Sequence, residues 1–446
     1  MTRPIHTLAI ALLAAALWAC SDGGGGKADA GTDAGADDYV LDWQSLEPVG
    51  PQREERHGYI LVWLTGTPVE MGRQHAQLLR DELQDGIENS SYVGQIIDRL
   101  PFARLLGFDD LALEQSYPSV VEECEGMVEE ANDVGWTMEL CLLVNFGDVV
   151  FENLPESTGA IAPGCSQLIA AGAATTDGRL YHGRLLDWGI VDFLLDYPVI
   201  FVRQPTDEIP HVYIGFPGNL SPYSGINAEG ISIGSNEADP GDDDQSDDEG
   251  RSHVQMLGRL LAEQSDLQGA LAAIEAADHM SVEAFGVADG QGLVGAAVEM
   301  TATAVGVRQM QDDVVYLTNH FVAPVTAELA LPYSSSLLRF ERLSQLVPPT
   351  GVGTRYGEID PSVLVEILRD RVNPYTDEES PAGTFDNDAS LATNGALYAI
   401  AFDPGRYRFW VAAGQIPVPE QPFVGFSLAE LLGAPDAPPV DPEFIE

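Results

Sequence analysis

The stretch Gly164–Trp188 constrains this chain more than any other part of the sequence. Two runs of strand-forming residues flank Asp177-Gly178, a pair that tolerates the positive φ of a tight type I′ turn. The stretch therefore predicts a β-hairpin. Its first strand begins at Cys165, and its second strand ends with Arg184 and Asp187. Because the chain folds back on itself, a thiol, a cation and a carboxylate are expected at one end of the hairpin. This arrangement indicates a reactive cysteine.

Residues 1–38 are expected to lie outside the fold. Residues 1–20 resemble a lipoprotein signal peptide, with a basic start, an apolar run and a closing Leu-Trp-Ala-Cys that would place a lipid on Cys20. Residues 21–38 form an acidic Gly/Ala/Asp tether that cannot bury apolar surface. We therefore expect an exported protein, either a lipoprotein anchored in an outer membrane or a periplasmic or extracellular protein. Any membrane contact is expected only through the lipid on Cys20.

The charge of the chain excludes several classes of partner. The formal net charge is −49, and Lys27 is the only lysine. Such a chain is repelled by nucleic acids and by anionic membrane surfaces. The densest acidic run, residues 239–249, lacks the glycine and the closing glutamate of a calcium loop and is expected to be solvated. No metal-ligand cluster, phosphate-binding loop or dinucleotide fingerprint is apparent, so no metal or cofactor is expected.

Residues 39–446 are even in composition, and no linker divides them, so we expect one large domain. Helical periodicity is expected over residues 67–83, 111–131, 137–150, 252–277, 335–346 and 361–371. Besides the hairpin, strands are expected over residues 57–64, 199–203, 211–216, 230–234, 285–288, 295–300, 314–318, 396–402 and 408–413. Strand clusters separated by helical pairs predict an α+β fold in which two sheets are layered with helices on their outer faces.

Two further cysteines, Cys124 and Cys141, lie on consecutive helical segments. An exported location permits a disulfide between them. Two buried free thiols are an equally good interpretation of the sequence.

Motifs along the domain resemble a known enzyme family in its own order. The chain is similar to the autoproteolytic N-terminal-nucleophile (Ntn) acyltransferases and hydrolases typified by isopenicillin N acyltransferase. It also resembles choloylglycine hydrolases and penicillin V acylases. The motifs that carry the resemblance are Gly66-x-Pro68-x-Glu70-Met71-Gly72-x-Gln74-His75, Gly164-Cys165-Ser166, Gly183-Arg184-x-x-Asp187-Trp188, Ser224-Gly225-Ile226-Asn227-x-x-Gly230, Leu317-Thr318-Asn319-His320-Phe321 and Ser336-Leu337-Leu338-Arg339-Phe340-Glu341-Arg342.

The resemblance implies a four-layer αββα sandwich with a helical segment before the nucleophile. It also implies that the chain cuts its own Gly164–Cys165 bond, leaving residues 39–164 and 165–446 as two chains. Cys165 then carries a free α-amine, whose pKa of about 8 suits it to act as the base for its own thiol.

The resemblance also implies a role for each site residue. Arg184 favours the thiolate of Cys165, and Asp187 holds and orients the new α-ammonium. Asn227 and Asn319 match positions that stabilise the tetrahedral oxyanion, and Arg339 matches an arginine of the charge network, although Arg342 lies close by. The implied substrate is a small-molecule amide. Water then releases the acid, whereas acyl-CoA or an amine acceptor belongs to a transferase.

Three alternatives remain open from the residues. A papain-like hydrolase could pair Cys165 with His182 or His320 and would need no chain cleavage. A non-catalytic surface lipoprotein could keep the fold and bind a ligand. Asn227 lies in a turn-like segment and could serve the backbone alone.

Overall fold

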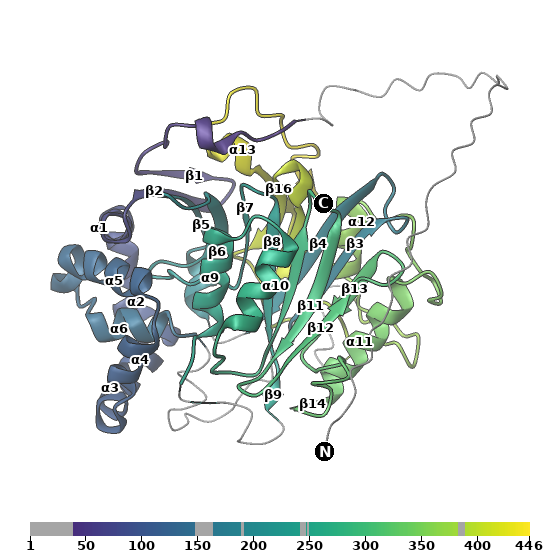
Figure 1. The fold of residues 1–446 in the computed structure, drawn as a ribbon, viewed down its shortest axis with the longest axis horizontal. Coiled ribbons are helices and arrows are strands. Elements are labelled where there is room, and N and C mark those ends of the chain that lie inside the picture. The colour runs from purple at the N-terminus through teal and green to yellow at the C-terminus, as the bar shows by residue number, and fades with distance from the viewer. Residues whose placement is uncertain (1–38, 148–163, 189–190, 241–246, 248, 382–388) are drawn as a thin grey trace, which may run out of the picture. The chain divides into compact units, whose positions relative to one another are not determined.

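Two large sheets organise the part of the chain that the computed structural model describes, residues 39–147, 164–188, 191–240, 247, 249–381 and 389–446. The predicted signal peptide, Cys20 and the tether lie outside the described residues. Tyr39–Glu446 forms one compact unit (Figure 1). The predicted α+β architecture is confirmed.

The first sheet has nine strands in the order β1-β2-β5-β6-β7-β8-β10-β11-β12. All neighbouring strands in it are antiparallel except β2 and β5, which are parallel. The strands are β1 (Gln52–Arg56), β2 (Tyr59–Gly66), β5 (Val199–Pro205), β6 (His211–Gly215), β7 (Ser224–Asn227), β8 (Ile231–Glu237), β10 (Glu283–Asp289), β11 (Val294–Met300) and β12 (Val305–Gln309).

The second sheet has seven antiparallel strands in the order β13-β3-β4-β15-β16-β17-β18. The hairpin that contains the predicted nucleophile lies within this sheet. The strands are β13 (Val314–Leu317), β3 (Ser166–Gly172), β4 (Gly178–Asp187), β15 (Ala396–Asp403), β16 (Arg408–Ala413), β17 (Phe423–Ser427) and β18 (Phe444–Ile445); a separate pair is formed by β9 (Asp239–Pro240) and β14 (Ala330–Leu331).

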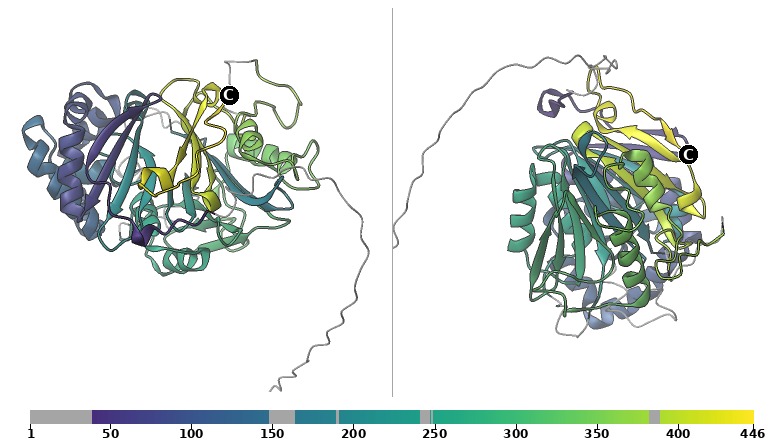
Figure 2. Two further views of the ribbon diagram at one scale, coloured as in Figure 1. Left: turned by 90° about the horizontal axis from the view of Figure 1, so that it is seen from above. Right: turned by 90° about the vertical axis from the view of Figure 1, so that its right-hand side faces the viewer.

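Buried apolar side chains define four layers. Helices α9 (His253–Glu263) and α10 (Leu267–Ala276) pack on the nine-stranded sheet through a cluster that includes Leu257, Ile274 and Phe285. Helices α11 (Ser334–Leu346) and α12 (Pro361–Leu368) cover the seven-stranded sheet. The two sheets meet through Ile169 and Leu180 on one side and Ala284 and Ala297 on the other. The order is therefore helices, sheet, sheet, helices (Figure 2), because each sheet buries both of its faces.

A helical segment precedes the nucleophile, as expected. Its helices are α1 (Pro68–Leu78), α2 (Arg80–Asn89), α3 (Ser91–Leu106), α4 (Phe108–Gln115), α5 (Pro118–Ala131) and α6 (Met138–Val144). Helix α1 begins with a reciprocal capping box between Thr67 and Glu70. Helices α1 and α5 cross closely at Gly72 and Gly126, where a Cβ atom would lie 2.0 to 2.1 Å from a backbone carbonyl oxygen of the other helix.

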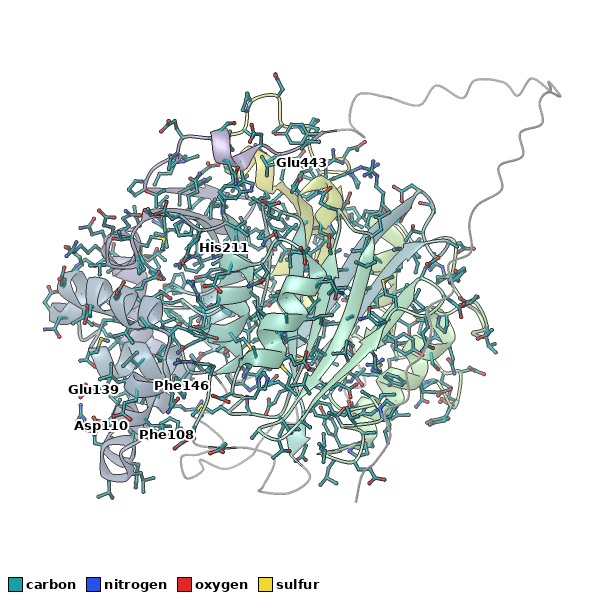
Figure 3. All side chains as sticks on the ribbon, viewed as in Figure 1. Phe108, Asp110, Glu139, Phe146, His211 and Glu443 are labelled. Carbon is teal, nitrogen blue, oxygen red and sulfur yellow. A yellow bond between two sulfur atoms is a disulfide. The ribbon has the colours of Figure 1, made fainter. Side chains whose placement is uncertain are left out.

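Two contacts close this helical segment on itself. The rings of Phe108 and Phe146 pack edge to face with their centroids 5.9 Å apart (Figure 3). A disulfide joins Cys124 of α5 to Cys141 of α6, so the disulfide is the arrangement the structure adopts. Cys165 is the free cysteine among the described residues.

The hairpin Gly164–Trp188 is confirmed, but its predicted turn is wrong. The strands β3 and β4 pair antiparallel, yet residues 173–177 form a longer loop and β4 begins at Gly178. A register shift between Ala170 and Gly172 accompanies this loop. The loop is held by tertiary contacts with the segment before α12, since the Thr176 N–H donates to the Ile359 carbonyl and the Gly357 N–H donates to the Ala174 carbonyl. Such contacts are invisible in the local sequence.

Candidate active site

Cys165 lies at the start of β3, with only 3% of its surface exposed. Its Sγ lies 3.8 Å from the backbone carbonyl oxygen of Asp187, to which the thiol donates. Burial raises the pKa of the Cys165 thiol, and the charge of Arg184 opposes that rise. The thiol therefore occupies an apolar site in which a nearby cation is the main influence that favours its ionised form.

Arg184 is fully buried and lines the same small cavity as Cys165. In the β3–β4 register it faces Gln167, two residues beyond Cys165. Its Nη1 donates to the Tyr398 hydroxyl at 2.8 Å and its Nε to the Ser235 carbonyl at 3.2 Å. These bonds to β15 and β8 fix the guanidinium between the two sheets, where its charge acts on the thiol.

Asp187 lies against the predicted cleavage point. A Cβ atom on Gly164 would fall 2.1 Å from its Oδ2, and one on Gly395 would fall 2.1 Å from its Oδ1. Only glycine therefore fits at either position. The Thr393 hydroxyl donates to Oδ2. Burial raises the pKa of Asp187, and the Thr393 hydrogen bond opposes that rise. The carboxylate is thus placed beside the residue that would lose its peptide bond to Cys165.

Arg339 joins the nucleophile to Asn319. Its Nη1 donates to the Cys165 carbonyl at 2.5 Å, and its Nη2 donates to Asn319 Oδ1 at 2.7 Å. The Asn319 amide donates to the Glu237 carbonyl at 2.7 Å. Arg342 instead pairs with Asp370 at 2.7 Å. Of the two neighbouring arginines, the structure therefore places Arg339 in the site.

Asn227 is not part of this arrangement, which corrects the prediction that it serves the oxyanion. Its Nδ2 donates to the Leu261 and Gln264 carbonyls at 2.9 and 2.8 Å. Its Oδ1 accepts from the backbone N–H groups of Glu229 and Ile231. All four hydrogen-bonding positions of its side chain are therefore used to tie the β7–β8 turn to the end of α9. Asn227 is a backbone-supporting residue.

Asn236 occupies the place that was expected for Asn227. Its Nδ2 donates to the Thr318 carbonyl at 3.1 Å and to the Cys165 carbonyl at 3.4 Å, and its Oδ1 accepts from Gln167 at 2.7 Å. Asn236 was not predicted as a site residue, because the strand expected at residues 230–234 continues to Glu237. Asn236 lies two residues beyond the predicted end of this strand. A strand extended to Glu237 would have shown Asn236 as a polar residue on a buried strand.

Neither histidine of the papain-like alternative contacts the thiol. His182 lies between the sheets, 3.0 Å from both Ser232 Oγ and Gln167 Oε1. His320 Nδ1 contacts Ser336 Oγ at 2.8 Å. Burial lowers the pKa of His182 to about 3 and that of His320 to about 4. Both are neutral at pH 7 and are engaged elsewhere, so a Cys–His pair is not formed.

The cavity at Cys165 is small, about 10 Å³, and is lined by Cys165, Arg184, Leu186, Trp188, Tyr223, Ser235 and Glu237. A larger cavity of about 660 Å³ lies by the β1–β2 turn and the C-terminal residue and contains none of the predicted site residues. Among the described residues, no three His, Cys, Asp or Glu side chains are grouped to hold a metal ion. No helix in the described part of the chain has the length and apolar character needed to cross a membrane.

Residues 176–415, more than half of the chain, match the family described as acyl-coenzyme A:6-aminopenicillanic acid acyl-transferase. The chain belongs to this family. Arg184, Asp187, Asn319 and Arg339 lie within the matched residues, and Cys165 lies shortly before them. This match confirms the family resemblance found in the sequence.

Individual proteins that are similar to this chain share only a small part of its sequence. An uncharacterized protein of Archaeoglobus fulgidus is 25% identical over 353 residues, which cover 70% of this chain and 58% of the relative. The chain thus spans less than two thirds of that relative. The N-acylethanolamine-hydrolyzing acid amidase ortholog of Caenorhabditis elegans has 14% identity and a TM-score of 0.38, covering 54% of this chain and 93% of its own. Penicillin V acylase from Agrobacterium tumefaciens has 15% identity and a TM-score of 0.33, covering 56% and 83%.

Proposed function

We propose that this protein is a self-processing cysteine amidase, in which Cys165 attacks the carbonyl carbon of an amide in a small acylated amine. One observation carries the proposal. Gly164 lies against the buried Asp187 carboxylate, and Arg339 donates to the carbonyl of Cys165, so both residues that flank the proposed cleavage point have a charged neighbour. An inert buried cysteine needs neither partner.

The first step of the proposal is self-cleavage. The Cys165 sulfur attacks the Gly164 carbonyl carbon, the carbon–nitrogen bond between the two residues breaks, and the nitrogen takes up a proton to become the Cys165 α-amine. Water then hydrolyses the resulting thioester and leaves a carboxylate on Gly164. The Asp187 carboxylate lies beside Gly164. We propose that it stabilises the positive charge of the new ammonium by an ion pair.

The second step is turnover. The α-amine takes the thiol proton, the thiolate forms a thioester with the substrate acyl group, and the substrate's amine leaves with that proton. Water then hydrolyses the thioester, which releases the acid and restores the Cys165 thiol. Arg184 is proposed to stabilise the thiolate. Asn319 and Asn236, whose amides donate to backbone carbonyls in the uncut chain, are proposed to donate to the tetrahedral oxygen during turnover. One such donor typically contributes about 3 kcal/mol to lowering the barrier.

The uncut site supports the order of these two steps. A cavity of about 10 Å³ admits no acylated amine. Cleavage separates Gly164 from Cys165 and is proposed to open the space for substrate. The apolar walls of that cavity, Trp188 and Tyr223, suit an apolar acyl group. Hydrolysis is proposed over acyl transfer, whether the acyl group would come from acyl-CoA or pass to an amine acceptor, since water is in excess outside the cell. Export and a lipid on Cys20 remain predictions from the sequence.

The test combines intact-mass measurement and N-terminal sequencing of the purified protein and of C165A. Two fragments, the larger beginning at Cys165, are expected for the natural chain, with C165A left uncut. The cut protein is then offered N-acyl amines of increasing chain length, with and without hydroxylamine as an acceptor. Acid release without hydroxamate supports hydrolysis. A folded chain that stays uncut and releases no acid overturns the proposal.

A further inference from the structure

Asn319 reaches the site on a segment that follows β13, and the next residues of that segment are held from the opposite sheet. Residues 322–326 contact Glu299, which lies on β11 of the nine-stranded sheet, whereas β13 belongs to the seven-stranded sheet. Glu299 is fully buried. Burying a carboxylate costs folding free energy unless its oxygens accept hydrogen bonds. The donors around Glu299 therefore show which segments the carboxylate holds in place.

The carboxylate of Glu299 accepts hydrogen bonds from four residues. The N–H of Val322 lies 3.0 Å from both oxygens, the N–H of Ala323 lies 2.8 Å from Oε2, and the Thr326 hydroxyl lies 2.7 Å from Oε2. Arg308 Nε completes the set at 2.8 Å from Oε1. The three donors from residues 322–326 all come from the segment that carries Asn319. This segment is therefore bound to a single carboxylate.

The surroundings of Glu299 are shaped for this contact. Gly306 faces Glu299 in the β11–β12 register, and a Cβ atom there would lie 2.6 Å from the Thr326 hydroxyl. Arg308 also donates to the Tyr316 carbonyl on β13 at 3.0 Å. The pair Glu299 and Arg308 therefore binds the strand before Asn319 as well as the segment after it.

We propose that Glu299 is a positioning residue for Asn319. Its carboxylate holds residues 322–326 against the nine-stranded sheet, which fixes Asn319 beside Arg339 and the Cys165 carbonyl. Glu299 does not touch the reacting atoms and acts through the segment that carries Asn319. The catalytic consequence rests on the proposed amidase function, whereas the structural consequence stands apart from it.

The test compares E299Q with a matched control, E123Q. Glu123 is also a buried carboxylate bonded to an arginine, Arg203, at 2.6 and 2.8 Å, but it lies in α5 outside this segment. The amide of E299Q turns a donor towards the N–H groups of Val322 and Ala323. Hydrogen exchange of the folded variants, read on peptides that cover residues 318–326, is expected to be at least tenfold faster in E299Q and unchanged in E123Q.

Steady-state kinetics on the cut enzymes form the second arm. In E299Q, kcat is expected to fall by about 10- to 100-fold while KM changes by less than about twofold, because the transition state depends on Asn319 more than ground-state binding does. If E299Q does not fold, T326V removes one donor to the same carboxylate and is expected to change both measurements in the same direction by a smaller factor.

Unchanged exchange in residues 318–326 of E299Q overturns the positioning role. A fall in kcat no larger than that of E123Q overturns its catalytic consequence. If the natural chain releases no acid from any amide, the proposed function fails, and the exchange measurement still decides whether Glu299 holds the segment.

Discussion

At the scale of single residues, burial and charge oppose each other at the nucleophile. Desolvation disfavours the thiolate of Cys165, and Arg184 and Arg339 act in the other direction. The two arginines differ in what they hold. Arg184 bonds to Tyr398 and Ser235, whereas Arg339 bonds directly to the Cys165 carbonyl. Arg339 thus controls the position of the nucleophile's backbone as well as its charge.

The first prediction compares the neighbouring arginines on α11. R339K keeps the charge but loses the two-armed contact with Cys165 and Asn319, and kcat/KM is expected to fall by about 100-fold, or about 3 kcal/mol. R342K is the control, because Arg342 pairs with Asp370 outside the site, and it is expected to lose less than twofold. Similar losses in the two variants would show that Arg339 acts only through stability.

The second prediction concerns the hydroxyl that supports Asp187. The Thr393 hydrogen bond lowers the pKa of Asp187, so T393V removes that bond and is expected to raise the pKa. Asp187 must be ionised to hold the Cys165 ammonium. The acid limb of the kcat/KM profile against pH is therefore expected to move to higher pH, with the plateau largely kept. T393S retains a hydroxyl, so its acid limb should lie at the same pH as in the natural protein. An acid limb that does not move in T393V contradicts the proposed support of Asp187 by Thr393.

At the scale of elements, one turn of α11 positions two site residues. Ser336 Oγ accepts from the Asn319 backbone N–H at 2.8 Å, and Arg339, three residues further along the helix, holds the Asn319 side chain. Residues three apart lie on one face of a helix. Strand β8 makes a similar contribution, because its end delivers Ser235 to Arg184 and Asn236 to the Cys165 carbonyl.

The third prediction separates the two asparagines. N227A breaks four hydrogen bonds in a buried turn and is expected to cost about 2 kcal/mol or more of unfolding free energy, measured by urea denaturation. The kcat of the remaining folded enzyme should change by less than twofold. N236A is expected to lower kcat by about 10- to 100-fold. A large kcat loss in N227A with stability unchanged would return Asn227 to the site.

At the scale of the whole molecule, a net charge of −49 coexists with a set of buried, uncharged histidines. Burial lowers the pKa of four of them to about 3, namely His75, His182, His211 and His253. Burial also raises the pKa of Asp403 to about 6. Acid therefore lowers the stability of the folded protein through its histidines, which the unfolded chain protonates more readily. Acid also protonates surface carboxylates, and this raises stability because it weakens the repulsion between negative charges. The two effects change the free energy of unfolding in opposite directions as the pH falls.

The fourth prediction concerns stability in acid. A histidine whose folded pKa lies below its unfolded value loses stability as pH falls from about 6.5 towards 3, because the unfolded chain binds the proton first. Each of the four is expected to cost about 2 kcal/mol at pH 5, and Asp403 offsets about 1 kcal/mol in total. Urea unfolding at pH 7 and pH 5 in 0.5 M NaCl, which screens surface repulsion, should show a loss of several kcal/mol. A gain on acidification would contradict the dominance of the histidines.

The sequence by itself determined the class of fold and many of its elements, and it predicted most residues of the candidate site. Periodicity identifies strands and helices because burial on one face repeats with the period of the element. Cys165, Arg184, Asp187, Asn319 and Arg339 were predicted from the ordered motifs that resemble the family, and such motifs are read directly from the sequence. The capped start of α1 at Thr67 was also readable, since a capping box is a local interaction.

Only the tertiary structure decided which of two similar residues does each task. Asn227 ends β7 and Asn236 lies near the end of β8, and Arg339 and Arg342 share one helix, so local sequence does not separate the members of each pair. Packing separates them, because Asn227 is used by the end of α9 and Arg342 by Asp370. The five-residue loop of the hairpin and the contact of Glu299 with residues 322–326 likewise depend on partners far away in the chain. Such contacts exist only once the two sheets are brought together.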